Sequence, residues 1–156
     1  MKKARIKTPL GIAELTGDKE GLASVKVLED GEASSEIPVE LETPVKQLQG
    51  YFKGELKNFD LKINPQGTEF QKKVWNKLLE IPFAITTSYL ELSRSLGDEK
   101  AIRAVASANG KNPLWIIIPC HRVIGKDGSL TGYAGGLHRK KWLLDHENPP
   151  VQQSLF

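Results

Sequence analysis

Near the N-terminus, hydrophobic and polar residues alternate in short runs that are separated by turn residues. Two of these runs, residues 5–7 and 12–15, lie on either side of Thr8-Pro9-Leu10-Gly11, and a third, residues 22–28, follows a turn over residues 17–21. Alternation with a period of two places the apolar side chains on one face of a strand. The pattern predicts a small antiparallel sheet.

The apolar spacing then changes to that of a helix. Val45, Leu48 and Phe52 lie three or four residues apart, so they share one face of a helix. Thr43 is suited to cap this helix, and Gly54 is suited to end it. A sheet followed by a helix predicts an α/β domain in the N-terminal part of the chain.

The second half of the chain contains further helix start signals. Thr68 and Ser88 are each followed three residues later by Gln or Glu, which is the spacing of a capping box. A third helix is expected to begin near Asp98 and to run towards Gly110. Two short helices joined by a turn are typical of a helix-turn-helix, although an ordinary helical hairpin has the same pattern.

The only cysteine of the chain follows its most apolar run. Residues 114–118 are predicted to form a buried strand, which runs directly into Pro119-Cys120-His121-Arg122. A cysteine in this position is either an inert buried side chain or a nucleophile. The abrupt change to proline, histidine and arginine favours the nucleophile. So do the glycine-rich residues 131–136, because glycine lets the backbone approach a ligand closely.

Composition limits the classes of protein to consider. The 156 residues, 39% of them hydrophobic, are enough for one ordinary domain or two small ones. The chain has no apolar run that could cross a bilayer and no secretory signal, which indicates a soluble, cytoplasmic protein. One cysteine cannot form an internal disulfide, and three histidines with one cysteine fit no zinc spacing, so we expect neither a metal nor a cofactor.

Charge is distributed unevenly along the chain. Residues 1–64 contain ten Lys/Arg and eleven Asp/Glu, whereas residues 65–156 contain twelve Lys/Arg and eight Asp/Glu. The second part of the chain therefore has an excess of basic residues. This excess permits a nucleic-acid partner, although a solvated basic face has the same composition.

The residues around Cys120 are also the centre of a resemblance to a known family. The sequence resembles the 6-O-alkylguanine-DNA alkyltransferases, also called methylated-DNA-protein-cysteine S-methyltransferases, whose signature matches Pro119-Cys120-His121-Arg122. The resemblance is strong over residues 65–147. Other matching motifs are Gly67-Thr68-Glu69-Phe70-Gln71, Val74-Trp75, Ser88-Tyr89, Arg103-Ala104-Val105, Gly132-Tyr133-Ala134-Gly135-Gly136-Leu137, Lys141-Trp142-Leu143-Leu144-Asp145-His146-Glu147 and, weakly, Tyr51-Phe52-Lys53-Gly54.

This resemblance implies a fold and an activity. The fold would comprise an α/β, ribonuclease-H-like N-terminal domain with its connector over residues 1–64, and a mainly helical, winged-helix-like C-terminal domain with the helix-turn-helix over residues 65–149. Residues 150–156 would form a flexible tail. The implied activity is DNA repair, in which a methyl or larger alkyl group moves from 6-O-alkylguanine, and also from 4-O-alkylthymine, to Cys120. The transfer would be irreversible, with one monomer used for each lesion in double-stranded DNA.

The resemblance assigns catalytic roles to four residues. Cys120 would be the nucleophile, His121 would take its proton through a water molecule, and Glu147 would orient His121, as in a catalytic triad. Tyr89 would donate a proton to the departing guanine. The water is expected because adjacent residues of an extended chain point to opposite sides. Without the resemblance, Glu147 reads as a solvated residue at a helix end and Tyr89 as a half-buried residue of a first helical turn.

The resemblance also implies a surface that binds DNA. Arg103 would fill the space left when the damaged nucleotide is turned out of the duplex, with the protein in the minor groove. The small side chains of Ala104 and Ser107 would let their helix approach closely. Asn112 would brace the turn before the active site, although an Asn-Pro pair is equally a plain turn signal. The remaining residues expected at the base are Val123, Tyr133 and Gly135.

The last residues of the chain resemble a docking peptide. Gln152-Gln153-Ser154-Leu155-Phe156 is similar to the peptide by which bacterial repair proteins bind the replication sliding clamp, although so short a motif has many chance matches. Two other functions fit parts of the sequence. A helix-turn-helix protein that recognises alkylated DNA without chemistry would not need Cys120, and a cysteine hydrolase would turn over acyl substrates without a DNA-binding helix.

Overall fold

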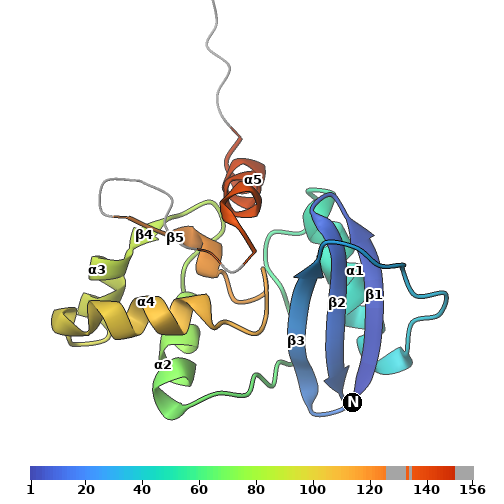
Figure 1. Ribbon diagram of the computed structural model, residues 1–156, viewed down its shortest axis with the longest axis horizontal. Coiled ribbons are helices and arrows are strands. Elements are labelled where there is room, and N and C mark those ends of the chain that lie inside the picture. Colours follow the sequence, from blue (N-terminus) through green and yellow to red (C-terminus); the bar gives the residue numbers. More distant parts are fainter. Residues whose placement is uncertain (126–132, 134, 150–156) are drawn as a thin grey trace, which may run out of the picture.

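The computed structural model describes residues 1–125, 133 and 135–149, which form two lobes (Figure 1). The N-terminal lobe contains the strands β1 (Lys2–Thr8), β2 (Gly11–Asp18) and β3 (Gly21–Leu28). They pair in the order β1-β2-β3 and are antiparallel, so the predicted sheet is confirmed. Ala4 lies opposite Leu15, and both are fully buried because alternate residues of a strand face the same side.

Helix α1 (Glu42–Phe52) packs on this sheet (Figure 1). It begins earlier than expected, because the 3₁₀ helix Val39–Leu41 runs directly into it. Thr43 therefore lies inside the first turn and does not cap the helix, which corrects the prediction. Gly54 follows the end of the helix with φ +77°, a left-handed conformation that glycine adopts at little cost. Tyr51, on the inner face of the helix, is fully buried.

The C-terminal lobe is mainly helical. Thr68 and Gln71 form the predicted capping box before its first helix, and Ser88 caps its second. The second and third helices pack against each other across the turn at Gly97, so the predicted fold class with a helix-turn-helix is confirmed. The elements of this lobe are α2 (Glu69–Leu78), β4 (Thr87–Ser88), α3 (Tyr89–Ser95), α4 (Ile102–Gly110), β5 (Val123–Ile124) and α5 (Leu137–Glu147), with β4 and β5 paired in parallel.

The prediction of a strand over residues 114–118 is wrong. Leu114 makes a single bridge to Val25 of β3, and the segment then turns, with Ile116 at φ +71°. All five side chains of the segment are nevertheless buried. Its apolar character therefore comes from packing in the interior and not from pairing in a sheet, and a short apolar run does not distinguish the two.

Helix α5 ties the two lobes together. Its residue Arg139 donates hydrogen bonds to the carbonyl oxygen of Leu10 at 2.9 Å and to the carboxylate of Glu29 at 3.1 Å, both in the N-terminal lobe. A third hydrogen bond, of 2.8 Å, reaches the carbonyl oxygen of Gly135. The buried hydrophobic residues of both lobes form one connected core. Among the helices described, none is long and apolar enough to cross a membrane.

Candidate active site

Cys120 is the first residue of a short 3₁₀ helix, Cys120–Arg122. It is 6% exposed and lines a cavity of about 460 Å³ together with Trp115, Tyr133 and residues of β3. The backbone turns at Pro119, where ψ is 62°, so the chain is not extended at this point. The prediction of an extended chain at Cys120 and His121 is therefore wrong, because the segment turns where a strand was expected.

His121 is fully buried and faces Glu147, the last residue of α5. Its Nε2 lies 2.7 Å from Glu147 Oε2, and we assign the proton to Nε2 because a carboxylate can only accept. Nδ1 then carries a lone pair, and it has no hydrogen-bond partner within the described part of the chain. Burial lowers the pKa of His121 below its ordinary value, and the hydrogen bond with Glu147 offsets only part of this effect. His121 is therefore a neutral base.

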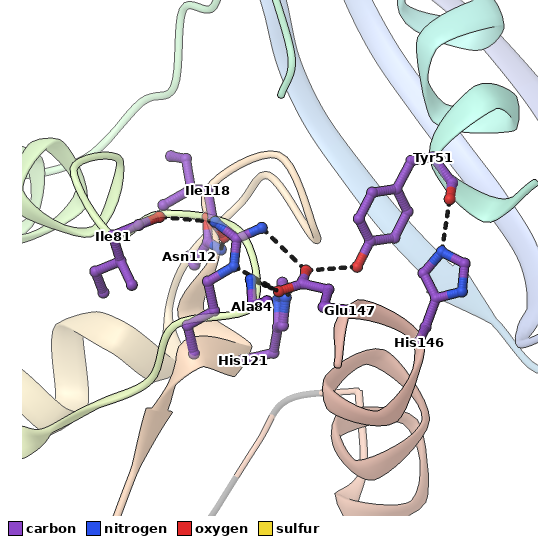
Figure 2. A network of polar contacts seen from close by, with 9 residues as sticks. Tyr51, Ile81, Ala84, Asn112, Ile118, His121, His146 and Glu147 are labelled. Carbon is purple, nitrogen blue, oxygen red and sulfur yellow. Dashed lines mark hydrogen bonds and ion pairs between the residues drawn. The ribbon is translucent and has the colours of Figure 1, made fainter. Parts of the chain in front are cut away.

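The carboxylate of Glu147 is the centre of the polar network in Figure 2. Besides the bond with His121, Oε2 accepts hydrogen bonds from the Tyr51 hydroxyl at 2.7 Å and from Arg122 Nη2 at 3.0 Å. The other oxygen, Oε1, accepts from Arg122 Nε at 2.8 Å and from the backbone N–H of Ala84 at 3.2 Å. Glu147 is 5% exposed, which excludes a solvated residue at a helix end.

These contacts determine the charge of Glu147. Burial alone would raise the pKa of its carboxyl group, but the hydrogen bonds from His121 and Arg122 more than offset burial and hold the pKa well below its usual range. The group is therefore ionised at neutral pH. An ionised carboxylate bonded to one nitrogen of an imidazole fixes the tautomer of the ring and stabilises its protonated form.

The thiol of Cys120 is un-ionised in this environment. Burial raises its pKa, while contact with Asn112 and the positive charge of Lys140 act in the opposite direction without cancelling the rise. Lys140 lies on α5 and is fully buried, with Nζ 6.0 Å from the centre of the Tyr133 ring. A buried thiol needs a base to become a thiolate, which is its reactive form.

Asn112 braces the turn that leads to Cys120. Its Nδ2 donates to the carbonyl oxygen of Ile118 at 2.7 Å, and its Oδ1 accepts from the backbone N–H of Leu114 at 2.9 Å. Asn109, on α4, adds a longer bond of 3.5 Å to the carbonyl oxygen of Cys120. The side chains thus supply the hydrogen bonds that a strand would have supplied.

Tyr133 and Gly135 line the same cavity as Cys120. A Cβ atom on Gly135 would lie 2.9 Å from Cε2 of Tyr133, so a side chain at this position would displace the ring. Burial, and to a smaller extent the electrostatic interaction with the neighbouring Cys120, raises the pKa of Tyr133 well above its ordinary value. The phenol therefore stays protonated. Residues 131–132 and 134 of the glycine-rich stretch, and the docking peptide at residues 152–156, lie outside the described residues.

Tyr89 and Val123 lie at the paired strands β4 and β5. Strand β5 directly follows Cys120–Arg122, and its Ile124 pairs with Ser88, the residue before Tyr89. Val123 is fully buried, whereas Tyr89 is half-buried. Within the described ranges, no hydrogen bond joins the Tyr89 hydroxyl to the thiol.

Arg103, Ala104 and Ser107 lie on the exposed face of α4, whereas Val105 and Ala108 face the core. The exposed face therefore combines small side chains with one long cation. Such a face can approach a polyanion closely. This face belongs to the helix that also carries Asn109, so the element that presents the surface also contacts the backbone of Cys120.

Sequence reasoning does not single out three residues of this site. Arg122 stands inside the matching signature, and Tyr51 stands inside the weak N-terminal motif, but neither position predicts a contact with Glu147. The bond between Tyr51 and Glu147 joins residues 96 positions apart. Lys140 has no signal at all beyond its place in a helix, because a lysine is ordinarily exposed.

Two family models match this chain. The family description "6-O-methylguanine DNA methyltransferase, ribonuclease-like domain" matches residues 1–65, and "6-O-methylguanine DNA methyltransferase, DNA binding domain" matches residues 69–149. The ribonuclease-like character expected of the N-terminal lobe is thereby confirmed.

Individual relatives cover nearly the whole chain. The methylated-DNA–protein-cysteine methyltransferase of Methanosarcina acetivorans is 50% identical in an alignment of 151 positions that covers 92% of this chain and 96% of that protein. Its counterpart in Mycobacterium tuberculosis is 43% identical in an alignment of 158 positions that covers 97% of this chain and 96% of that protein. The crystal structure of M. tuberculosis OGT in complex with DNA, 44% identical, has a TM-score of 0.84 and covers 92% of this chain and 90% of that chain. The chain belongs to the family of 6-O-methylguanine DNA methyltransferases.

Proposed function

We propose that Cys120 accepts a methyl or larger alkyl group from the 6-oxygen of guanine in DNA, and that each molecule acts once. The family gives the coarser statement, DNA repair by alkyl transfer to a cysteine, and this chain has one cysteine. The observation that carries the proposal is the arrangement around His121. Its Nε2 is bonded at 2.7 Å to the carboxylate of Glu147, while Nδ1, in the residue next to the thiol, is left to accept a proton.

In the proposed reaction, His121 Nδ1 takes the thiol proton through one water molecule, and the thiolate attacks the alkyl carbon. The sulfur–carbon bond forms as the carbon–oxygen bond breaks, and the bonding electrons go to the guanine oxygen. Tyr89 donates a proton to the departing guanine and regains one from the imidazolium through solvent. Glu147, held ionised by Arg122, stabilises the imidazolium while it exists.

The product would be a thioether, whose carbon–sulfur bond is not opened by thiol exchange. The chain has no second cysteine that could take the group over. Each molecule would therefore be consumed by one transfer. The same reaction would apply to 4-O-alkylthymine, because its alkyl carbon is likewise bonded to an exocyclic oxygen of a base.

On the DNA side, α4 would enter the minor groove of the duplex, and Arg103 would occupy the space of the nucleotide turned out of the stack. The exposed positions of Arg103, Ala104 and Ser107 support this role, and the M. tuberculosis structure in complex with DNA supports DNA as the partner. The walls of the pocket for the base would come from Asn112, Val123, Tyr133 and Gly135.

The two lobes correspond to two domains with different functions. Residues 65–149 would form the domain that holds the thiol and the DNA surface, residues 1–64 the N-terminal domain with its connector, and residues 150–156 a tail. We expect the protein to act as a monomer, because one chain contains all the groups that the reaction needs.

The intact mass of the protein tests the proposal most directly. We would incubate the protein with a duplex that contains one 6-O-methylguanine, beside Cys120→Ala as the control. The expected result is one added methyl group per molecule, located on Cys120 and absent from the variant. Tight binding to this duplex with no change in mass would contradict the transfer and would indicate a DNA-binding protein without chemistry. Turnover of an acyl substrate would indicate a hydrolase.

The C-terminal sequence supports a second, smaller proposal. Gln152-Gln153-Ser154-Leu155-Phe156 would bind a bacterial sliding clamp. Deletion of these five residues should abolish association with a purified clamp and leave methyl transfer to a short duplex unchanged. Equal clamp binding by the full chain and the truncated chain would contradict it.

A further inference from the structure

Tyr51 brings a phenol from the N-terminal lobe to the centre of the active-site network. It lies on α1 and is fully buried, and its hydroxyl donates a 2.7 Å hydrogen bond to Glu147 Oε2. The same oxygen accepts the 2.7 Å bond from His121 Nε2. Figure 2 shows Tyr51 and His121 on different sides of the carboxylate of Glu147. One carboxylate oxygen thus joins the N-terminal lobe directly to the residue expected to act as base.

The position of the phenol is fixed at both ends of the residue. His146, next to Glu147 on α5, donates from Nε2 to the backbone carbonyl oxygen of Tyr51 at 2.6 Å. The ring of Tyr51 packs against Phe59, with centroids 5.6 Å apart, and against the edge of Phe83 at 6.3 Å. A hydroxyl held in this way contributes a defined direction to the carboxylate that it bonds.

The phenol remains a donor at any pH at which the protein works. Burial, with a further contribution from the charge of Glu147, raises the pKa of Tyr51 far above its ordinary value. The hydroxyl therefore competes with His121 for the electron density of one oxygen atom. The other charged groups that act on His121 are Arg122, in its own 3₁₀ helix, and Lys140, on α5.

We propose that Tyr51 is a positioning residue for alkyl transfer, whose hydroxyl aligns the carboxylate of Glu147 with His121. The N-terminal lobe thereby supplies a group that positions the carboxylate of the proton relay. This inference rests on the proposed function, because it assigns Tyr51 to the same relay.

A purely structural role for Tyr51 predicts a different outcome from a positioning role. If the hydroxyl only satisfies a buried carboxylate, its loss lowers the stability and the amount of folded protein. If the Tyr51 hydroxyl shares Oε2 of Glu147 with His121, removal of the hydroxyl lets the carboxylate stabilise the imidazolium of His121 more strongly. The pKa of His121 then rises. The pH midpoint of the transfer rate then moves upward, because His121 must be neutral to accept a proton.

The test compares Tyr51→Phe with Phe59→Leu, which disturbs the packing around the same ring but keeps the hydroxyl. Single-turnover methyl transfer to Cys120 is followed by mass from about pH 5 to pH 9, the range in which a histidine titrates. For Tyr51→Phe we expect transfer at neutral pH to slow by roughly 10-fold and the midpoint to rise by about half a pH unit. For Phe59→Leu we expect a lower melting temperature and an unchanged midpoint.

A second variant keeps the shape of the side chain, so that it tests the inference even if Tyr51→Phe fails to fold. Site-specific 3-fluorotyrosine at position 51 makes the phenol a stronger donor, and the midpoint should move downward. An unchanged pH midpoint in both Tyr51→Phe and the 3-fluorotyrosine protein would overturn the inference, as would a wild-type rate in Tyr51→Phe. Wild-type protein that gains no methyl group would instead overturn the proposed function itself.

Discussion

The guanidinium of Arg122 forms two hydrogen bonds with the carboxylate of Glu147, from Nε to Oε1 at 2.8 Å and from Nη2 to Oε2 at 3.0 Å. The two side chains are only 8% and 1% exposed. The remaining nitrogen of Arg122, Nη1, donates to the carbonyl oxygen of Ile81 at 2.8 Å. A planar guanidinium matches a carboxylate in geometry, so this buried pair fixes both the direction and the charge of Glu147.

Removal of Arg122 should therefore damage stability as well as rate. Arg122→Ala leaves a buried carboxylate without its cation, and we expect the free energy of unfolding to fall by roughly 3–5 kcal/mol in urea denaturation. The matched control is Arg94→Ala, which breaks a pair of the same length, 2.8 Å, whose side chains are more than half exposed. That change should cost less than about 1 kcal/mol. Equal losses in both variants would contradict the structural role of the buried pair.

Stability should fall as the pH falls, in two steps. His121 has a folded-state pKa below its ordinary 6.5, so the unfolded chain binds the proton at a higher pH than the folded protein does. The free energy of unfolding therefore decreases as the pH drops below about 6.5. Glu147 has a folded-state pKa below its ordinary 4.5, so its contribution is present above about pH 4.5 and is lost as the pH falls further.

Urea denaturation at a series of pH values measures both steps. His121→Gln should flatten the upper step and keep the lower one, and Glu147→Gln should flatten the lower step. An upper step that persists unchanged in His121→Gln would assign it to another group.

The local features of the fold follow from the sequence, and the long-range ones do not. The alternation over β1 to β3 and the capping signals at Thr68 and Ser88 involve residues a few positions apart, and the structure confirms them. Residues 114–118 are also apolar, but whether such a run pairs in a sheet or only packs in the interior depends on the rest of the fold. Here the segment turns instead of forming a strand.

The site divides in the same way. Cys120 and His121 stand next to each other in a recognisable signature, and their places in the interior are compatible with the expected roles. The donors to Glu147 include Tyr51 from α1 and the backbone N–H of Ala84, and only the tertiary structure brings them to one carboxylate.

Arg103 should matter for duplex DNA and not for folding. It is exposed on α4, so Arg103→Ala should leave the melting temperature unchanged. Without a side chain to hold the opened duplex, transfer from a duplex should slow by roughly 10-fold to 100-fold, because unstacking a base costs a few kcal/mol. Transfer from a single-stranded oligonucleotide should change much less. Lys46→Ala, which removes an exposed charge from α1, is the control, and a similar loss in that variant would point to charge alone.

Gly135 should tolerate no side chain without a loss of rate. The Cβ of Gly135→Ala would lie 2.9 Å from the ring of Tyr133, which must then move within the cavity that holds Cys120. A displacement of this size in a reacting site slows the reaction by roughly 10-fold to 100-fold. Gly50→Ala, in the interior of α1, meets only Leu56 at 3.4 Å and should stabilise the protein slightly. Single-turnover rates of both variants test this. A slow rate in Gly135→Ala alone would show that the space at residue 135 matters, whereas equal losses in both variants would point to a general effect of replacing glycine.

The contacts of α5 constrain how the two lobes can be recombined. Arg139 reaches Leu10 and Glu29, and Glu147 reaches Tyr51, so a single helix of the C-terminal lobe depends on three residues of the N-terminal lobe. A chimaera that joins the sheet of one relative to the helices of another would keep each set of local signals. It would lose these contacts unless their residues were exchanged together, so the lobes are expected to be inherited as a pair.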